Sequence, residues 1–479
     1  DNVTNKMVFK GNIEYLTENE IGIRLRATQQ NPSVLPAESL YAIEHDTMDT
    51  TFRSMYQGLY IYLSARKERR DLLLSQRPPR FDESLDSMIS RSEDDFTRIA
   101  LKAKAAQDYF LLIGPPGTGK TSCALKKMVE TFHADKDAQI LLLSYTNRAV
   151  DEICKSLASI APAVDFIRVG SELSCDEAYR GHLIENELSS CNRRSEVYER
   201  IRNCRIIVGT VAAISGKPEL FRLKHFDVAI IDEATQILEP QLLGILCARG
   251  EDGKDAIDKF VLIGDHKQLP AVVQQNTEQS AIYDESLLSI GLTNLKDSLF
   301  ERLYRNCTAT VHRSYDMLCR QGRMHPEVAL FANRAFYGGR LIPVGLPHQI
   351  ESSDTICRLA FYPSVPEKAG ASAKINYSEA RIVADLAVRI YEDHQTDFDE
   401  SRTLGIITPY RSQIALIKKE IESLGIPALN RILVDTVERF QGSERDVIIY
   451  SFCVNYPYQL KFLSNLTEEE GVLIDRKLN

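Results

Sequence analysis

Eight consecutive residues, Gly114–Thr121, constrain the fold of this 479-residue chain more than any other feature of its sequence. They read GPPGTGKT and lie between an apolar run, Tyr109–Ile113, and a segment in which apolar residues have helical spacing. Glycines in such a segment let successive backbone N–H groups surround a phosphate at the N-terminus of a helix. Lys120 would then reach the β- and γ-phosphates of a nucleotide, and the Thr121 hydroxyl would bind Mg²⁺. The expected nucleotide-binding residues are Gly114, Pro115, Pro116, Gly117, Thr118, Gly119, Lys120 and Thr121.

Apolar runs alternate with amphipathic segments after Tyr109, which is typical of parallel sheets with crossover helices. One set of predicted strands comprises Tyr109–Ile113, Ile140–Ser144, Ile206–Val208, Val228–Ile231 and Phe260–Ile263. A second set comprises Leu404–Thr408, Ile432–Val434 and Val447–Ser451. We therefore expect an α/β protein with two such domains. The first would span residues 81–300, with a helical insertion at about 171–203, and the second would span residues 301–479.

The residues before 81 have a different pattern. Met7–Phe9, Asn12–Leu16 and Ile21–Ala27 are short strand-like runs, which indicate a small antiparallel barrel within residues 1–46. From about Thr47 to Leu74, apolar residues recur at steps of three and four, which predicts one or two amphipathic helices. We therefore expect a helical stalk over residues 47–80.

Two carboxylates follow the predicted strand Val228–Ile231. In a parallel sheet, the carboxyl ends of the strands form the edge at which ligands bind. At that edge Asp232 would hold Mg²⁺ through water, and Glu233 would orient and deprotonate the attacking water. Gln268 follows the next strand in the segment GDHKQLP, where its amide would detect a γ-phosphate. The expected metal ligands are thus Thr121 and Asp232.

Composition restricts the class of protein further. A net charge of −9 argues against indiscriminate binding of polyanions, although a local basic groove is still allowed. The apolar runs are much shorter than the ~18 residues of a membrane-spanning helix, so no membrane partner is expected. The ten cysteines are scattered without a C-x-x-C pair, which predicts reduced thiols and a cytoplasmic or nuclear location. Cys175, His182, Cys191 and Cys204 lie in one stretch, but their spacing matches no zinc motif.

Seven segments follow one another between Gly114 and Asp446. They read GPPGTGKT, SYTNRAVDEI, DEATQ, GDHKQLP, QGRMHP, ITPYRSQ and VDTVERFQGSERD. In wording and order they resemble the motifs of superfamily 1 group B helicases, in the style of the nonsense-mediated-decay helicase and the replication helicase-nuclease. The resemblance implies two RecA-like domains that use ATP and Mg²⁺. It also implies a barrel inserted in the first domain, of which the N-terminal strands would be a remnant.

The same resemblance assigns roles to further residues. Arg323 would supply positive charge to the γ-phosphate in the transition state. Gly442 would lie near the γ-phosphate, and Glu444 near the ribose. The residues expected to contact the nucleic-acid backbone are Asn147, Thr210, Thr408 and Thr436. Short polar side chains at strand ends also serve as helix caps, and this alternative stays open.

The chain departs from the family pattern at several places. Gly322 stands where the family has a tyrosine that stacks on adenine, so the sequence does not determine selectivity for the base. The last motif of the family, which carries a second arginine for the γ-phosphate, is not reached before Asn479. We therefore expect an incomplete second domain and weak ATP hydrolysis by this stretch alone.

These observations predict an ATP-dependent helicase or translocase. It would be a monomeric motor that moves 5′-to-3′ on single-stranded nucleic acid, with DNA favoured over RNA, and a nuclease domain would precede it if the resemblance extends that far. Two alternatives stay open. One is an ATP-gated nucleic-acid-binding switch without productive unwinding, and the other is a P-loop ATPase that acts on protein.

Overall fold

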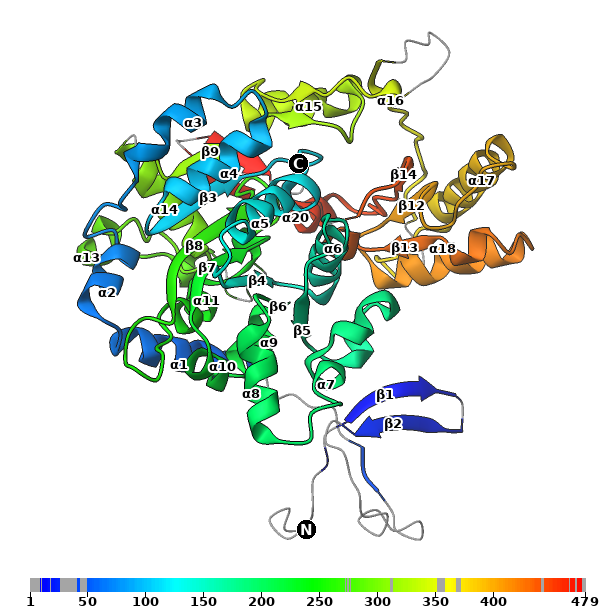
Figure 1. Ribbon diagram of the computed structural model, residues 1–479. Coiled ribbons are helices and arrows are strands. Elements are labelled where there is room, and N and C mark those ends of the chain that lie inside the picture. The colour runs from blue at the N-terminus through cyan, green and yellow to red at the C-terminus, as the bar shows by residue number, and fades with distance from the viewer. Residues whose placement is uncertain are drawn as a thin grey trace. The chain divides into compact units, whose positions relative to one another are not determined.

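The computed structural model describes most of the chain (Figure 1). The described residues are 9, 11–17, 19–25, 41–43, 50–271, 273, 275, 277–310, 313–350, 358–367, 372–440, 443–464, 466–469 and 472–475. The chain divides into two compact units, Asp1–Arg53 and Ser54–Asn479. Among the described residues, no helix is both long enough and apolar enough to cross a lipid bilayer.

The first unit contains an antiparallel hairpin of β1 (Gly11–Leu16) and β2 (Ile21–Leu25). These strands confirm the prediction at residues 12–16 and the described part, residues 21–25, of the prediction at residues 21–27, whose last two residues lie outside the described residues. The prediction at residues 7–9 lies outside the described residues except for Phe9, which is not in a strand. Of the barrel expected over residues 1–46, the structure therefore describes one hairpin.

A seven-stranded parallel sheet forms the centre of the second unit, in the order β5-β6-β4-β7-β8-β3-β9. Its two faces bury different residues, since Leu111 of β3 packs in one apolar cluster while Phe110 and Leu112 pack in the other. Burial on both faces explains why these strands are continuous apolar runs. The strands are β3 (Tyr109–Ile113), β4 (Ile140–Ser144), β5 (Phe166–Val169), β6 (Ile206–Thr210), β7 (Phe226–Ile231), β8 (Ile257–Gly264) and β9 (Tyr315–Met317).

Helices cover both faces of this sheet (Figure 1). One cluster includes α4 (Asp95–Ala105), α5 (Lys126–His133) and α6 (Asn147–Ala158). The other includes α9 (Val211–Ser215), α10 (Glu219–Leu223), α11 (Glu239–Leu246) and α14 (Leu299–Ala309). The insertion expected at about 171–203 contains η5 (Glu172–Ser174), η6 (Glu177–His182), α7 (Ile184–Glu187) and α8 (Arg194–Asn203). The shorter elements elsewhere in this part are η3 (Glu83–Leu85), α3 (Asp86–Arg91), η7 (Ala234–Gln236), α12 (Thr277–Ser280) and α13 (Glu285–Ser289).

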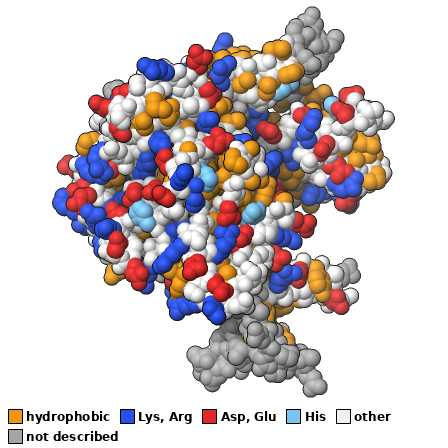
Figure 2. Space-filling view, viewed as in Figure 1, with side chains coloured by type: hydrophobic (Ala, Val, Ile, Leu, Met, Phe, Trp, Pro, Cys, Tyr) orange, Lys and Arg blue, Asp and Glu red, His pale blue; other side chains and the backbone are white. Residues whose placement is uncertain are grey.

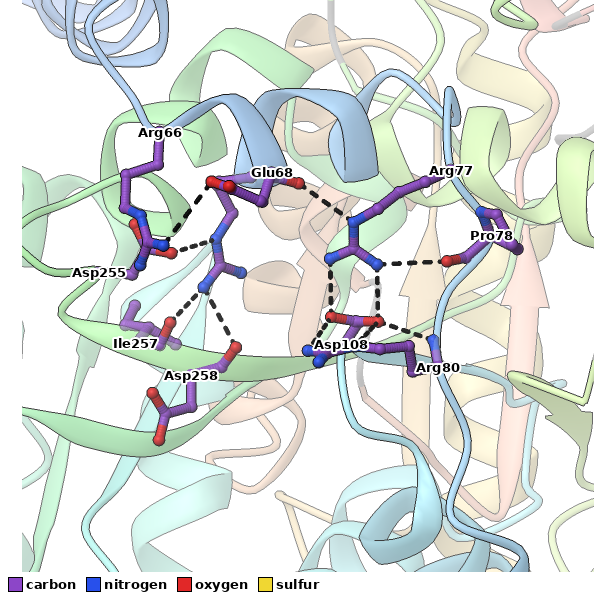
Figure 3. A network of polar contacts seen from close by, with 10 residues as sticks. Arg66, Glu68, Arg77, Pro78, Arg80, Asp108, Asp255, Ile257 and Asp258 are labelled. Carbon is purple, nitrogen blue, oxygen red and sulfur yellow. Dashed lines mark hydrogen bonds and ion pairs between the residues drawn. The ribbon is translucent and has the colours of Figure 1, made fainter.

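The predicted stalk consists of α1 (Thr50–Leu63) and α2 (Lys67–Leu73). Charged contacts fasten the segment from α2 onward to the sheet, as Figure 3 shows. Arg77 and Arg80 both pair with Asp108 at 2.9 Å, and Asp108 is the residue immediately before β3. Burial alone would raise the pKa of Asp108, but the hydrogen bonds from Arg77 and Arg80 outweigh it and hold that pKa well below its usual range. The stalk segment is therefore fixed to the strand that leads into Gly114–Thr121.

A second, three-stranded parallel sheet has the order β13-β12-β14. Its strands are β12 (Leu404–Ile407), β13 (Leu433–Asp435) and β14 (Val447–Tyr450), and they confirm the second predicted set to within a residue or two. Its core also contains α17 (Tyr377–Asp393) and α18 (Arg411–Ser423). The remaining elements are β10 (Arg320–Gln321), α15 (Pro326–Tyr337), β11 (Ile342–Pro343), α16 (Pro347–Ile350), η8 (Leu429–Arg431), α19 (Val437–Phe440), η9 (Pro457–Gln459), α20 (Leu460–Leu463), β15 (Leu466–Glu469) and β16 (Val472–Asp475).

The boundary predicted between residues 300 and 301 is too early. It falls inside α14, whose Leu303 and Cys307 pack in the same apolar cluster as β3. The strand β9 then pairs with β3 in the first sheet. The first α/β domain therefore includes residues up to at least Met317.

Candidate nucleotide-binding site

The loop Gly114–Thr121 joins β3 to a short π-helical turn, η4 (Lys120–Leu125), that leads into α5. Gly117 and Gly119 have φ values of +72° and +76°, a left-handed conformation that side-chain-bearing residues rarely adopt. A Cβ atom at Gly117 would also collide with Arg323. The Thr118 hydroxyl donates to the Pro115 carbonyl at 2.7 Å, which closes the turn. The predicted phosphate-binding loop is therefore present between a strand and a helix.

The predicted catalytic side chains lie at the carboxyl ends of neighbouring strands. Lys120 Nζ is 3.5 Å from Glu233 Oε1. The Thr121 hydroxyl donates to Asp232 Oδ2 at 2.5 Å, and Asp232 Oδ1 accepts from the Glu233 backbone N–H at 2.9 Å. Glu233 has a φ of +53°, a left-handed backbone conformation that is uncommon for a residue other than glycine. The structure thus brings these four residues together, and their catalytic roles stay predictions.

Asp232 and Thr121 fit a Mg²⁺ ion. Both offer oxygen atoms, which are the ligands that this ion prefers. Asp232 is 1% exposed, and burial together with the charge of Glu233 raises its pKa. A divalent cation would offset both effects, because it favours the ionised carboxylate.

The loop after β8 carries the predicted sensor, Gln268. Its Nε2 donates to Asp265 Oδ2 at 2.8 Å, and the Tyr337 hydroxyl donates to the same oxygen at 2.6 Å. Asp265 is completely buried, and its burial raises its pKa while the charge of Lys120 lowers it. Gln268 therefore lies in a hydrogen-bond network that reaches the end of α15 and is close enough to Lys120 to feel its charge.

Arg323 lies beside the phosphate-binding loop. The backbone N–H of Gly322 donates to the Gly117 carbonyl at 2.8 Å, which fastens the Arg323 segment to the loop. The buried Gln321 side chain accepts from the backbone N–H of Arg323 at 3.1 Å. Arg323 Nε donates to Glu444 Oε2 at 2.8 Å. Arg323 and Glu444 are thus brought together, whereas Gly442 lies outside the described residues.

The four residues expected to contact nucleic acid lie at or shortly after the carboxyl ends of parallel strands. Asn147 is the partly buried first residue of α6, and Thr436 is partly buried before α19. The Thr210 hydroxyl caps α9 by accepting from the Ala213 backbone N–H at 3.1 Å. Thr408 is completely buried, and its hydroxyl has no partner among the described residues. The cap alternative therefore holds for Thr210, and the nucleic-acid contacts stay predictions.

On the face shown in Figure 2, Lys and Arg side chains are mixed with Asp and Glu side chains, so this face carries no large patch of one sign of charge. This mixture agrees with the net charge of −9. The stretch with Cys175 and Cys204 offers no metal cluster among the described residues, where the only such group is His225, Asp227 and Asp258. That group lies at the amino ends of β7 and β8, the opposite edge from Lys120.

Sequence reasoning missed Asp265, Tyr337 and Gln349. Gln349 Nε2 donates to the backbone carbonyls of Gln321 and Met324, both at 3.0 Å, and so supports the Arg323 loop from α16. Asp265 lies in the segment GDHKQLP, where a buried carboxylate directly after a strand was a usable signal. Tyr337 and Gln349 carried no such signal, since their contacts depend on the tertiary fold.

Two family models match this chain, and each is described as an AAA domain. One matches residues 295–475, and the other matches residues 91–197 and 184–276. Together with the parallel sheets and the assembled motifs, these matches make the chain similar to the superfamily 1 helicases.

Within that class, the chain resembles the replication helicase-nucleases. It is 28% identical over 482 residues to DNA replication ATP-dependent helicase/nuclease DNA2 of Homo sapiens, with 88% of this chain and 41% of that protein covered. It is 27% identical over 492 residues to DNA replication ATP-dependent helicase/nuclease JHS1 of Arabidopsis thaliana, with 94% and 34% covered. It is 23% identical over 499 residues to DNA polymerase alpha-associated DNA helicase A of Saccharomyces cerevisiae, with 88% and 69% covered. The chain thus spans about two fifths of the length of the human relative.

Proposed function

We propose that this chain is the motor of an ATP-dependent helicase that moves 5′-to-3′ on single-stranded nucleic acid, with DNA favoured over RNA. One observation carries the proposal. Lys120, Glu233, Gln268 and Arg323, which are far apart in sequence, all lie on or are bonded to the segments around one phosphate-binding loop. The relatives are named as DNA helicases, which supports DNA as the track.

Each of these side chains has a task in ATP hydrolysis. Lys120 and the loop N–H groups bind the phosphates, while Thr121 and Asp232 would hold Mg²⁺, which neutralises charge on the phosphates. Glu233 orients water and accepts its proton. Arg323 and Gln268 donate to the γ-phosphate, so their contacts are lost when that group leaves.

Loss of these contacts would drive movement. A conformational change follows a ligand only if the ligand binds the two states with different affinity. Contacts from Arg323 and Gln268 exist only with a γ-phosphate, and they supply that difference. The strand contacts that we expect from Asn147 and Thr436, which are partly exposed, would then be made and released once in each cycle.

Further parts of the proposal rest on the relatives. They are named as helicase/nucleases, so we propose a nuclease domain N-terminal to this chain in its full protein. We also propose a monomeric motor with a nuclear or cytoplasmic location. A full-length gene without nuclease motifs would show that the proposal of an N-terminal nuclease domain is wrong.

The test is strand displacement on partial duplexes with either a 5′ or a 3′ single-stranded overhang, made of DNA or RNA. We expect ATP-dependent displacement from the 5′-overhang DNA. Glu233→Gln should abolish it, and Glu251→Gln, an exposed carboxylate before β8, should not. Displacement only from 3′ overhangs would reverse the direction. Hydrolysis of ATP without displacement from any substrate would favour the ATP-gated switch.

A further inference from the structure

A buried hydrogen-bond relay joins the loop after β8 to the end of α15. Asp265 accepts from the Tyr337 hydroxyl and from Gln268 Nε2 on one oxygen, and from the Lys267 backbone N–H at 3.0 Å on the other. All three groups are donors, so they suit an ionised carboxylate. Tyr337 is 2% exposed, and its ring packs with Phe336 and Leu341. The position of the Tyr337 hydroxyl is therefore fixed by packing.

The helix α15 touches the nucleotide-binding segments near both of its ends. It begins at Pro326, three residues after Arg323, and the Arg323 segment is bonded to Gly117. It ends at Tyr337, which bonds to Asp265. A 12-residue helix is a rigid rod of roughly 18 Å. A displacement at one end is therefore transmitted to the other.

We propose that Tyr337 is a positioning residue for γ-phosphate recognition, an inference that rests on the proposed ATP-driven function. An amide nitrogen carries two hydrogens. With Asp265 held by Tyr337, one hydrogen of Gln268 Nε2 is taken up by the carboxylate, and the other is presented to the γ-phosphate. Because Tyr337 and Arg323 flank the same helix, the two γ-phosphate contacts form and break together.

The test compares affinities for a triphosphate and a diphosphate, measured with fluorescent ADP and a fluorescent non-hydrolysable ATP analogue. Tyr337→Phe removes the hydroxyl and keeps the packed ring, so we expect folding to be preserved. The preference for the triphosphate should fall roughly tenfold, because the lost hydrogen bond is to a charged group. Gln268→Ala should cause a similar loss, and the double variant should lose no more than Gln268→Ala alone.

The matched control is Tyr109→Phe, which removes another buried hydroxyl, one that lies 3.4 Å from Cys307 Sγ. It should leave the triphosphate preference unchanged. Three outcomes would overturn the inference. The triphosphate preference could be unchanged in Tyr337→Phe, the double variant could lose the product of the two single losses, or the wild type could show no triphosphate preference. The proposed function has a separate readout in the stimulation of wild-type ATP hydrolysis by single-stranded DNA. If single-stranded DNA does not stimulate hydrolysis but the affinities change as expected, the proposed motor function is wrong and the role of Tyr337 still stands.

Discussion

Asp108→Asn should lower the free energy of unfolding by about 2–3 kcal/mol. The carboxylate is 4% exposed and accepts two hydrogen bonds from the Arg77 guanidinium at 2.9 Å, a further two from the Arg80 guanidinium, and one from the Arg80 backbone N–H at 2.7 Å. Removing one partner of a fully buried ion pair costs about 3–5 kcal/mol. The cost here is smaller because the Arg77 and Arg80 side chains are 29% and 66% exposed and regain water.

Urea unfolding followed by circular dichroism measures this loss, since the chain contains no tryptophan. With a slope of about 2–3 kcal/mol/M, the midpoint should fall by about 1 M at unchanged slope. The matched control is Asp86→Asn. The Asp86 carboxylate also accepts a bidentate pair of hydrogen bonds from an arginine, Arg313, but at an exposed position. The control should leave the midpoint unchanged, because solvent weakens exposed pairs.

The pH dependence gives a second check on Asp108. Its pKa is lowered in the folded state, so its contribution is complete above the unfolded value of about 4 and is lost as pH falls through the folded value. The difference between wild type and Asp108→Asn should therefore be constant from pH 8 to pH 5. A difference that shrinks in this range, or equal midpoints for Asp108→Asn and Asp86→Asn, would refute the reasoning.

Two further substitutions test local geometry. Gly117→Ala forces a Cβ against Arg323 at a φ of +72°, so nucleotide affinity should fall at least about tenfold in a fluorescence titration. Gly253→Ala is its control, with a φ of +75° and open space around it, and it should leave that affinity unchanged; equal affinities in both variants would contradict the close approach. Thr210→Val removes the cap of α9 and should cost about 1 kcal/mol of stability, whereas Thr210→Ser should retain it. Equal losses in the two Thr210 variants would show that the hydroxyl is not a cap.

The central strands of the first sheet could be predicted closely because their physical signal is local. The strands β3 and β4 have the predicted limits, since every residue in them is buried and apolar or small. The strand β5 was missed because Arg168 interrupts its apolar run. That side chain is 1% exposed and paired with Asp151, a partner that the strand's own sequence does not reveal. The strand β9 was missed for a similar reason, since its Asp316 pairs with Lys102 of α4 at 2.7 Å.

The nucleotide-binding residues were predictable where the chemistry lies in consecutive residues. The glycines before Lys120 permit the left-handed backbone of the loop, and Asp232 and Glu233 directly follow an apolar strand. The supporting residues were not predictable, because Tyr337 reaches Asp265 from 72 positions away. The boundary at residue 300 was wrong for the same reason. It depended on β9 joining the first sheet, which is a contact between distant segments.

The most direct test of the central claim is the steady-state rate of ATP hydrolysis with and without single-stranded DNA or RNA. The ratio of the two rates matters more than either rate, because the ratio does not depend on how fast the protein hydrolyses ATP alone. We predict strong stimulation, greater with DNA, and its complete loss in Glu233→Gln with nucleotide binding retained. No stimulation by either polymer, with nucleotide still bound, would contradict the motor.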